Sequence, residues 1–195
     1  SQDFPLTALQ PLLRRAESDL NLTGQLTANL DGHWKRSPQG PAIEAQGQVS
    51  VAQPTLRMPS VLGSDEINLA RLTANLDIYS AENQLLIRSV ELNSDVATLT
   101  VAGQAELADA LSVKSVMEKL LDWQSSHQYK VHGQIDVAAL AAQIPSLMKL
   151  REDTTISHGQ INLDLDSHLD LGSRILRGTL QTDRIAALAG GKTIT

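Results

Sequence analysis

The chain contains no cysteine, which excludes disulfides, thiolate nucleophiles, cysteine-ligated zinc and iron–sulfur clusters. Aromatic residues make up only 3% of the 195 residues, whereas 42% are hydrophobic. The core must therefore be mainly aliphatic, and disorder is not expected. No apolar run approaches the roughly 18 to 20 residues that a membrane-spanning helix needs. Residues 1–4 do not begin a signal peptide.

Positive charge is also scarce. Lys and Arg number 16 against 22 Asp and Glu, which leaves a formal net charge of -6. The chain therefore lacks the basic balance that nucleic acids or an anionic membrane surface attract, and we expect neither partner. The chain does not begin with Met, and residues 191–195 read like the start of another strand. We expect residues 1–195 to be one fragment of a larger repetitive β-protein, with two similar repeat units that divide near 108–130.

Strict alternation of apolar and polar residues is the clearest pattern in the chain. Within residues 157–171 the apolar positions are Ile161, Leu163, Leu165, Leu169 and Leu171. Successive side chains on a strand point to opposite faces, so such a strand has one apolar and one polar face. An antiparallel sheet tolerates this asymmetry because one face can remain solvated. Similar alternation predicts strands in residues 22–30, 72–78, 99–107 and 131–137.

Short sequence repeats accompany these strands. Gly-Gln followed by an apolar residue begins at Gly24, Gly47, Gly103, Gly133 and Gly159, with a weaker echo at Gly178. The hexapeptide Leu-Thr-Ala-Asn-Leu-Asp occurs at residues 26–31 and again at 72–77. Self-similarity of this kind indicates a repeat architecture.

Short helices are predicted between the strands, in residues 6–17, 113–123, 137–143 and 183–189. Pro5 suits a first helical turn, and Ser112 and Asp136 are suitable N-caps for the second and third helices. Four prolines, Pro38, Pro41, Pro54 and Pro59, make residues 36–60 the most loop-like or edge-like stretch. The predicted fold class is mainly β with short helices, an antiparallel sheet of long amphipathic strands punctuated by helices.

No motif frames a catalytic or metal site. Residues 190–193 (Gly-Gly-Lys-Thr) lack the earlier glycine of a phosphate-binding loop, because Ala186 stands at that position. Asp164, Asp166, His168 and Asp170 fall on one face of a strand, but alternate residues lie about 6.5 to 7 Å apart, so a solvated face is the preferred interpretation. No Gly-x-Ser-x-Gly nucleophile elbow is present. We expect no enzyme activity, cofactor or metal, although a triad assembled from distant residues would leave no such local mark.

One predicted strand opens with His132-Gly133-Gln134-Ile135-Asp136-Val137 and leads into a predicted helix, and residues 150–161 read as a turn that leads into a new strand. These features resemble the AsmA-like and TamB-type family of bacterial envelope proteins. The resemblance implies a periplasmic protein whose parent chain is anchored at the inner membrane of a diderm bacterium. It also implies a strongly curved sheet that forms a groove with an apolar interior, and a role in phospholipid transport between membranes or in outer-membrane biogenesis.

The functional prediction is a non-catalytic module that contributes an apolar β-groove, with phospholipid acyl chains or envelope proteins as partners. The residues expected to face lipid are Leu76, Leu99, Val101, Ile135, Leu163 and Leu165. The alternative is a structural or protein-interaction β-module with a closed core and no ligand. Periodicity alone fits both, because a lined groove and a filled core need the same apolar strand faces.

Overall fold

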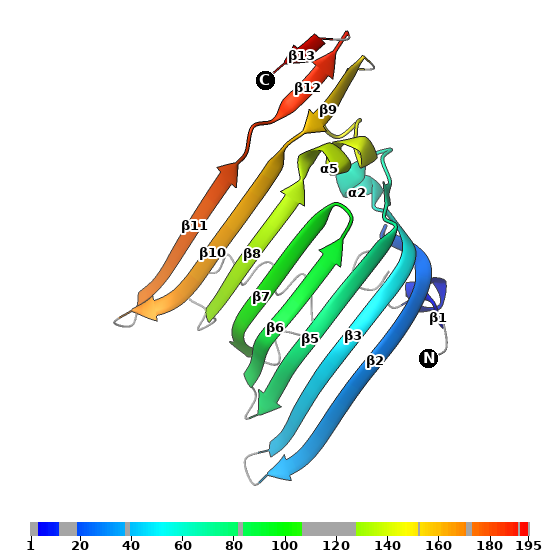
Figure 1. The fold of residues 1–195 in the computed structure, drawn as a ribbon. Coiled ribbons are helices and arrows are strands. Elements are labelled where there is room, and N and C mark those ends of the chain that lie inside the picture. Colours follow the sequence, from blue (N-terminus) through cyan, green and yellow to red (C-terminus); the bar gives the residue numbers. More distant parts are fainter. Residues whose placement is uncertain are drawn as a thin grey trace.

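A computed structural model of the chain describes residues 4–11, 19–37, 40–81, 84–106, 128–151, 153–170, 173–190 and 192–194. The structure is mainly β. One ten-stranded antiparallel sheet dominates it, and a three-stranded sheet and two short α-helices lie toward one end (Figure 1). This confirms the predicted fold class in its main terms.

The strands of the large sheet follow one another in space almost as they do in the chain, in the order β1-β2-β3-β5-β6-β7-β8-β10-β11, with β4 paired to β3. Their bounds are β1 Phe4–Pro5, β2 Asn21–Ser37, β3 Gly40–Arg57, β4 Ile67–Asn68, β5 Arg71–Ala81, β6 Gln84–Ser94, β7 Ala97–Glu106, β8 Gln128–Asp136, β10 Gln160–Asp170 and β11 Ser173–Thr182. The small sheet has the order β13-β12-β9, from Lys192–Ile194, Ala186–Ala189 and Thr154–His158. Within the described residues, each segment with strict alternation therefore lies in strands, except that Val137 begins a helix.

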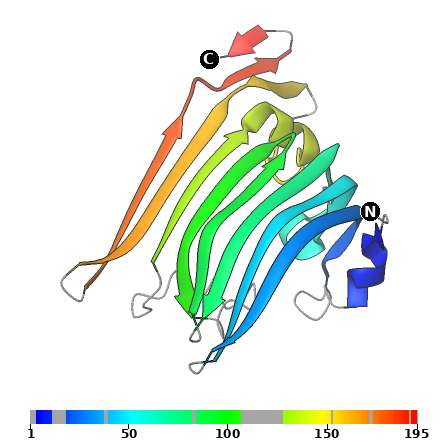
Figure 2. The same cartoon turned by 60° about the horizontal axis from the view of Figure 1, so that its bottom comes forward.

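The strong curvature expected for the sheet is not found. Figure 2 shows a twisted, bowed surface whose two outer strands, β2 and β11, lie far apart. Curvature in sheets is concentrated at β-bulges, which kink a strand locally. Four of the strand pairs, β3–β5, β7–β8, β8–β10 and β10–β11, keep one register along their whole length. Much of the sheet thus lacks the β-bulges that would curl it.

The prediction that residues 36–60 form a loop or an edge is wrong, because β3 is a long interior strand between β2 and β5. Its proline at position 54 is tolerated at an irregularity. Gln53 has a φ of +48°, and the β2–β3 register shifts beside Gly24. The carbonyl of Pro54 still accepts a hydrogen bond from Leu69 N at 3.0 Å. A bulge is a place where a strand can accommodate a residue that has no N–H.

Of the four predicted helices, one is confirmed with its predicted bounds. Helix α5 spans Val137–Gln143, and the Asp136 side chain accepts a hydrogen bond from Ala139 N at 2.9 Å, as an N-cap should. Within 6–17, η1 forms a short 3-10 helix at Leu6–Leu9 and residues 12–17 lie outside the described ranges. The predicted helix 113–123 and most of the predicted division near 108–130 also lie outside them; residues 128–130 belong to β8.

The predicted helix 183–189 is wrong, because Ala186–Ala189 forms strand β12 between β9 and β13. Alanine favours helices, but pairing on both sides overrides that weak preference. The expectation that the last residues start a further strand is confirmed by β13.

The buried apolar residues gather mainly at the helical end of the sheet. Helix α2, Pro59–Leu62, contributes Leu62, and α5 contributes Val137 and Ala141. Two hydrogen bonds join these regions: Asn68 N donates to Gln143 Oε1 at 3.0 Å and Leu147 N donates to Asp65 Oδ2 at 2.7 Å. Backbone hydrogen bonds between paired strands, rather than this small core, stabilise the broad middle of the sheet.

Candidate functional site

Two rows of apolar residues cross one face of the large sheet. Directly opposed residues of an antiparallel pair place their side chains on the same face, so the registers define each row. The Leu99 row consists of Ala28, Val49, Ala74, Leu92, Leu99, Gly133, Leu163 and Leu180. The Val101 row consists of Leu30, Gly47, Leu76, Val90, Val101, Val131, Leu165 and Gly178. Each row runs through all eight long strands without a polar or charged residue.

The six residues predicted to face lipid all lie on this face. Leu99 and Leu163 belong to the Leu99 row, and the Val101 row contains Leu76, Val101 and Leu165. Ile135 lies in the adjoining row, opposite Ala97 on one side and Ile161 on the other. All six are half-buried. The structure thus brings the predicted residues together, while their contact with lipid stays a prediction.

Other members of the rows were not singled out from the sequence, most clearly those on β6. Val90 and Leu92 occupy even positions, whereas Leu85 and Ile87 occupy odd ones. The change of phase arises from a register shift in β6 between Ile87 and Val90. Such a shift breaks strict alternation, so the pattern does not stand out. A search that allowed one extra residue in a strand would have found β6.

The opposite face of the sheet is polar. Arg88 Nη1 lies 2.7 Å from Glu44 Oε1 and 3.3 Å from Asp77 Oδ1, and the guanidinium sits 5.7 Å from the centre of the Tyr79 ring. The hydrogen bond and the charge of Arg88 lower the pKa of Glu44 below its ordinary value. The sheet is therefore amphipathic as a whole, with a hydrated face behind the apolar one.

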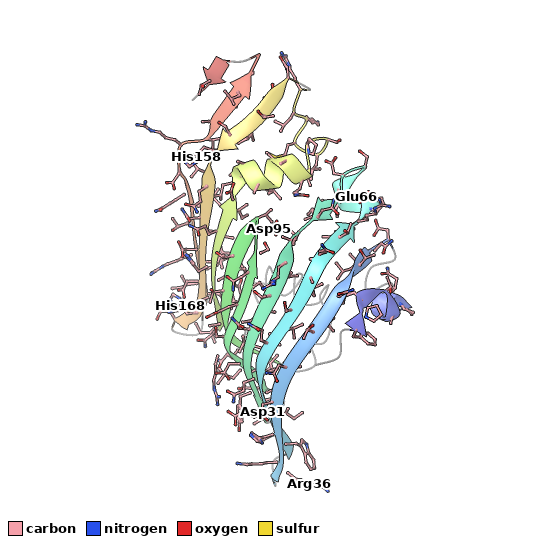
Figure 3. All side chains as sticks on the ribbon, turned by 45° about the vertical axis from the view of Figure 1, so that its right-hand side comes forward. Asp31, Arg36, Glu66, Asp95, His158 and His168 are labelled. Atoms are coloured by element: carbon pink, nitrogen blue, oxygen red, sulfur yellow. The ribbon has the colours of Figure 1, made fainter. Side chains whose placement is uncertain are left out.

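Two aspartates of β10, Asp164 and Asp166, pair with histidines. His132 Nδ1 lies 2.7 Å from Asp164 Oδ1 on the neighbouring strand, and His168 Nδ1 lies 2.8 Å from Asp166 Oδ2. His168 is labelled near one end of β10 in Figure 3. Among the described residues, no group of three or more His, Asp or Glu side chains could hold a metal ion. These pairs therefore have the character of a solvated surface.

The described surface has open hollows lined by residues of several elements. One of about 430 Å³ lies between α5 and β9, and is lined by Ala138, Ala141, Leu150, Arg151 and Ile156 among others. Another of about 440 Å³ lies over the polar side of β7, β8, β10 and β11, where Lys130 and Arg177 face Asp164 and Asp166. Both are open, and charges of opposite sign offset one another in the second. The apolar face is the more distinctive feature.

Comparison with known proteins gives no match to a family profile, a curated protein or a solved structure. Within the described ranges, no helix has both the length and the apolar character needed to cross a membrane.

Proposed function

We propose that this chain is a non-catalytic module of a bacterial envelope protein, and that its apolar sheet face binds the acyl chains of phospholipids. The continuity of the Leu99 and Val101 rows across eight strands carries the proposal. The resemblance of the strands and turns to AsmA-like and TamB-type proteins supports a periplasmic location, with a parent chain anchored at the inner membrane. It also supports a role in phospholipid transport or outer-membrane biogenesis.

The physical basis of the proposal is the match between an acyl chain and an uncharged aliphatic surface. Strands lie about 4.8 Å apart, so eight of them present an apolar surface about 34 Å wide. Removing this surface and the acyl chain from water is favourable in proportion to the apolar area buried. Since the sheet is not strongly curled, the acyl chains would lie against a broad face rather than inside an enclosed trough.

A second candidate function is favoured by the half-burial of the six predicted residues. A structural or protein-interaction module would use the same rows to pack against protein, with no ligand. The two functions differ in whether a lipid competes for the face.

The experiment begins with the purified 195-residue chain. Native mass spectrometry and organic extraction would show co-purified phospholipid. Binding of a phosphatidylethanolamine with a fluorescent acyl chain would then be compared between Val101→Asp and Thr100→Asp. These neighbours on β7 place the same charge on opposite faces, because successive strand side chains alternate.

We expect Val101→Asp to weaken lipid binding at least about tenfold, because burying a carboxylate against an acyl chain is costly. Thr100→Asp should leave binding nearly unchanged. Val101→Thr keeps the β-branched shape and should weaken lipid binding less than Val101→Asp. Circular dichroism of each variant would detect any loss of folding. No bound lipid in the unsubstituted chain, or equal effects of the two Asp variants, would overturn the proposal and favour the closed module.

A further inference from the structure

The large sheet is open at both ends along long stretches of strand. In the described part of the chain, β1 pairs with β2 only through Phe4–Leu26 and Pro5–Gln25, and β11 pairs with β10 alone. Among the described residues, β2 from Ala28 onward has no strand on its outer side, and neither does β11. Neither open stretch contains a proline or a register shift, two devices that commonly protect an edge strand from pairing.

The two open edges run in opposite directions. Each neighbouring pair from β2 through β3, β5, β6, β7, β8 and β10 to β11 is antiparallel, so the direction reverses seven times between β2 and β11. A second copy shifted sideways would therefore bring its β2 alongside β11 in an antiparallel sense. Its apolar face would also lie on the same side, since the shift needs only a turn that follows the twist of the sheet, and such a turn does not exchange the two faces.

In one register of this contact, both the charges and the side-chain sizes of the two strands are complementary. Asp31 of β2 and Arg177 of β11 both lie on the polar face, opposite Gln46 and Asp166 respectively. Setting Asp31 of one copy opposite Arg177 of the other places opposite charges side by side. Asp31 is labelled toward the end of β2 that lies away from the helices (Figure 3).

The same register fits the apolar face. It sets Leu180 beside Ala28, Gly178 beside Leu30, and Leu176 beside Gly32, so that each large side chain meets a small residue. Leu180 is 66% exposed and Leu30 is 55% exposed, and these two would gain a covering neighbour. The Leu99 row of one copy, which ends at Leu180, would continue into Ala28, where the same row begins in the next copy. The Val101 row would likewise pass from Gly178 into Leu30.

We propose that β11 is a docking edge for β2 of a second copy of this chain. The contact joins different surfaces of the two copies, so it is head-to-tail and leaves a free β2 and a free β11 at the ends of every assembly. It extends the apolar face across successive copies. The inference does not depend on lipid binding, because backbone pairing and the Asp31–Arg177 contact would form without a ligand.

The absence of cysteine makes disulfide trapping a clean test. In the proposed register Asn29 of one copy opposes Thr179 of the other, and both are exposed. Opposed residues in an antiparallel pair have Cα atoms about 4.5 to 5.5 Å apart, which lies within the range that a disulfide spans. Asn29→Cys and Thr179→Cys would be purified separately, then oxidised mildly either alone or mixed.

We expect the mixture to form a disulfide-linked dimer at least about fivefold more abundant than in either variant alone, with peptide mapping that joins positions 29 and 179. Asn29→Cys mixed with Gln181→Cys, a diagonal pair about 7 to 8 Å apart, should form much less. Light scattering of the unsubstituted chain should show masses that rise with concentration past the dimer. Arg177→Asp should reduce that rise, and adding Asp31→Arg to the same chain should restore it.

Absence of the 29–179 linkage above these controls would overturn the inference. So would a linkage formed by Thr179→Cys alone, which would show that two β11 edges meet about a two-fold axis. Lipid-binding measurements would be unaffected by either result, so failure here is distinguishable from failure of the proposed function.

Discussion

Gly47 occupies a position in β3 that a side chain cannot share. Its φ is +150°, and a Cβ atom placed there would lie 2.1 Å from the carbonyl oxygen of Asn29. Because this neighbour is backbone, it cannot move aside without breaking the β2–β3 ladder. The repeated Gly-Gln pattern thus has a steric cause here, a close approach of adjacent strands.

We expect Gly47→Ala to lower the free energy of unfolding by about 2 kcal/mol or more, because the substitution combines overpacking with an unfavourable φ. Gly32→Ala on the neighbouring strand is the matched control. A Cβ at Gly32 would have its nearest neighbour, the carbonyl oxygen of Glu44, at 3.7 Å. Urea denaturation of both variants measures the difference, and equal losses would contradict the explanation.

Arg88 makes stability depend on the ionisation of Glu44. The pKa of Glu44 in the folded chain is lower than its ordinary value of 4.5. A lowered carboxyl pKa adds stability that is present above the ordinary value and is lost as the pH falls through the lowered one. We therefore expect Glu44→Gln to melt at a lower temperature than the unsubstituted chain at neutral pH.

The difference in melting temperature should vanish once the pH falls below the lowered pKa of Glu44. Glu91→Gln serves as a control on the same face. The partner of Glu91 is uncharged: its carboxylate accepts a hydrogen bond from the Asn75 amide at 3.4 Å. A difference between Glu44→Gln and the unsubstituted chain that persists unchanged in acid would show that Arg88 does not act through the charge of Glu44.

At the scale of elements, α5 depends on the cap that the sequence indicates. Asp136→Ala removes the acceptor for Ala139 N, and we expect it to cost about 1 kcal/mol of stability. Asp136→Asn retains a capping oxygen and should recover most of that loss. Thermal or urea unfolding measures both variants. Equal destabilisation by Ala and Asn would show that the negative charge, rather than the cap, matters.

Elements were predictable from the sequence where one local rule applied without interruption. Strict alternation identified β5 and β10, and Asp136 identified the start of α5. Among the strands that escaped, β3 and β6 did so because the rule was broken locally. In β3 the prolines suggested a loop, whereas Pro54 lies at a bulge; in β6 the extra residue near Arg88 changes the phase of alternation. Bulges are set by pairing with a neighbouring strand, and a single strand's sequence shows them only weakly.

At the scale of the whole molecule, the six residues predicted to face lipid lie on one face of the sheet, and alternation indicates the apolar face of each strand. The sequence could not show that the rows line up across eight strands, since register depends on turns and bulges. Nor could it show how little the sheet curls. Part of the candidate face was thus predictable in its residues, whereas its shape was not.

Hydrogen exchange should reveal a gradient of protection across the large sheet. Strands β5, β6, β7 and β8 are paired on both sides, whereas β11 is paired only with β10 in the described part of the chain. We expect amides in β11 to exchange faster than those in the four inner strands, because local opening of an edge breaks fewer interactions. Dilute samples keep any association between copies low. Protection in β11 equal to that in β6 would contradict this expectation.

The order of strands also has a consequence for how the molecule forms. From β2 to β8, each long strand pairs with the long strand before it, and β10 and β11 continue the series. Most of these pairings close short stretches of chain; the longer ones are residues 107–127 before β8 and 137–159 before β10. The entropic cost of closure grows only slowly with the length of the stretch. Each strand, once paired, exposes an edge to which the next strand can form backbone hydrogen bonds. The sheet can therefore grow in the direction of synthesis as the chain emerges, without waiting for its far end.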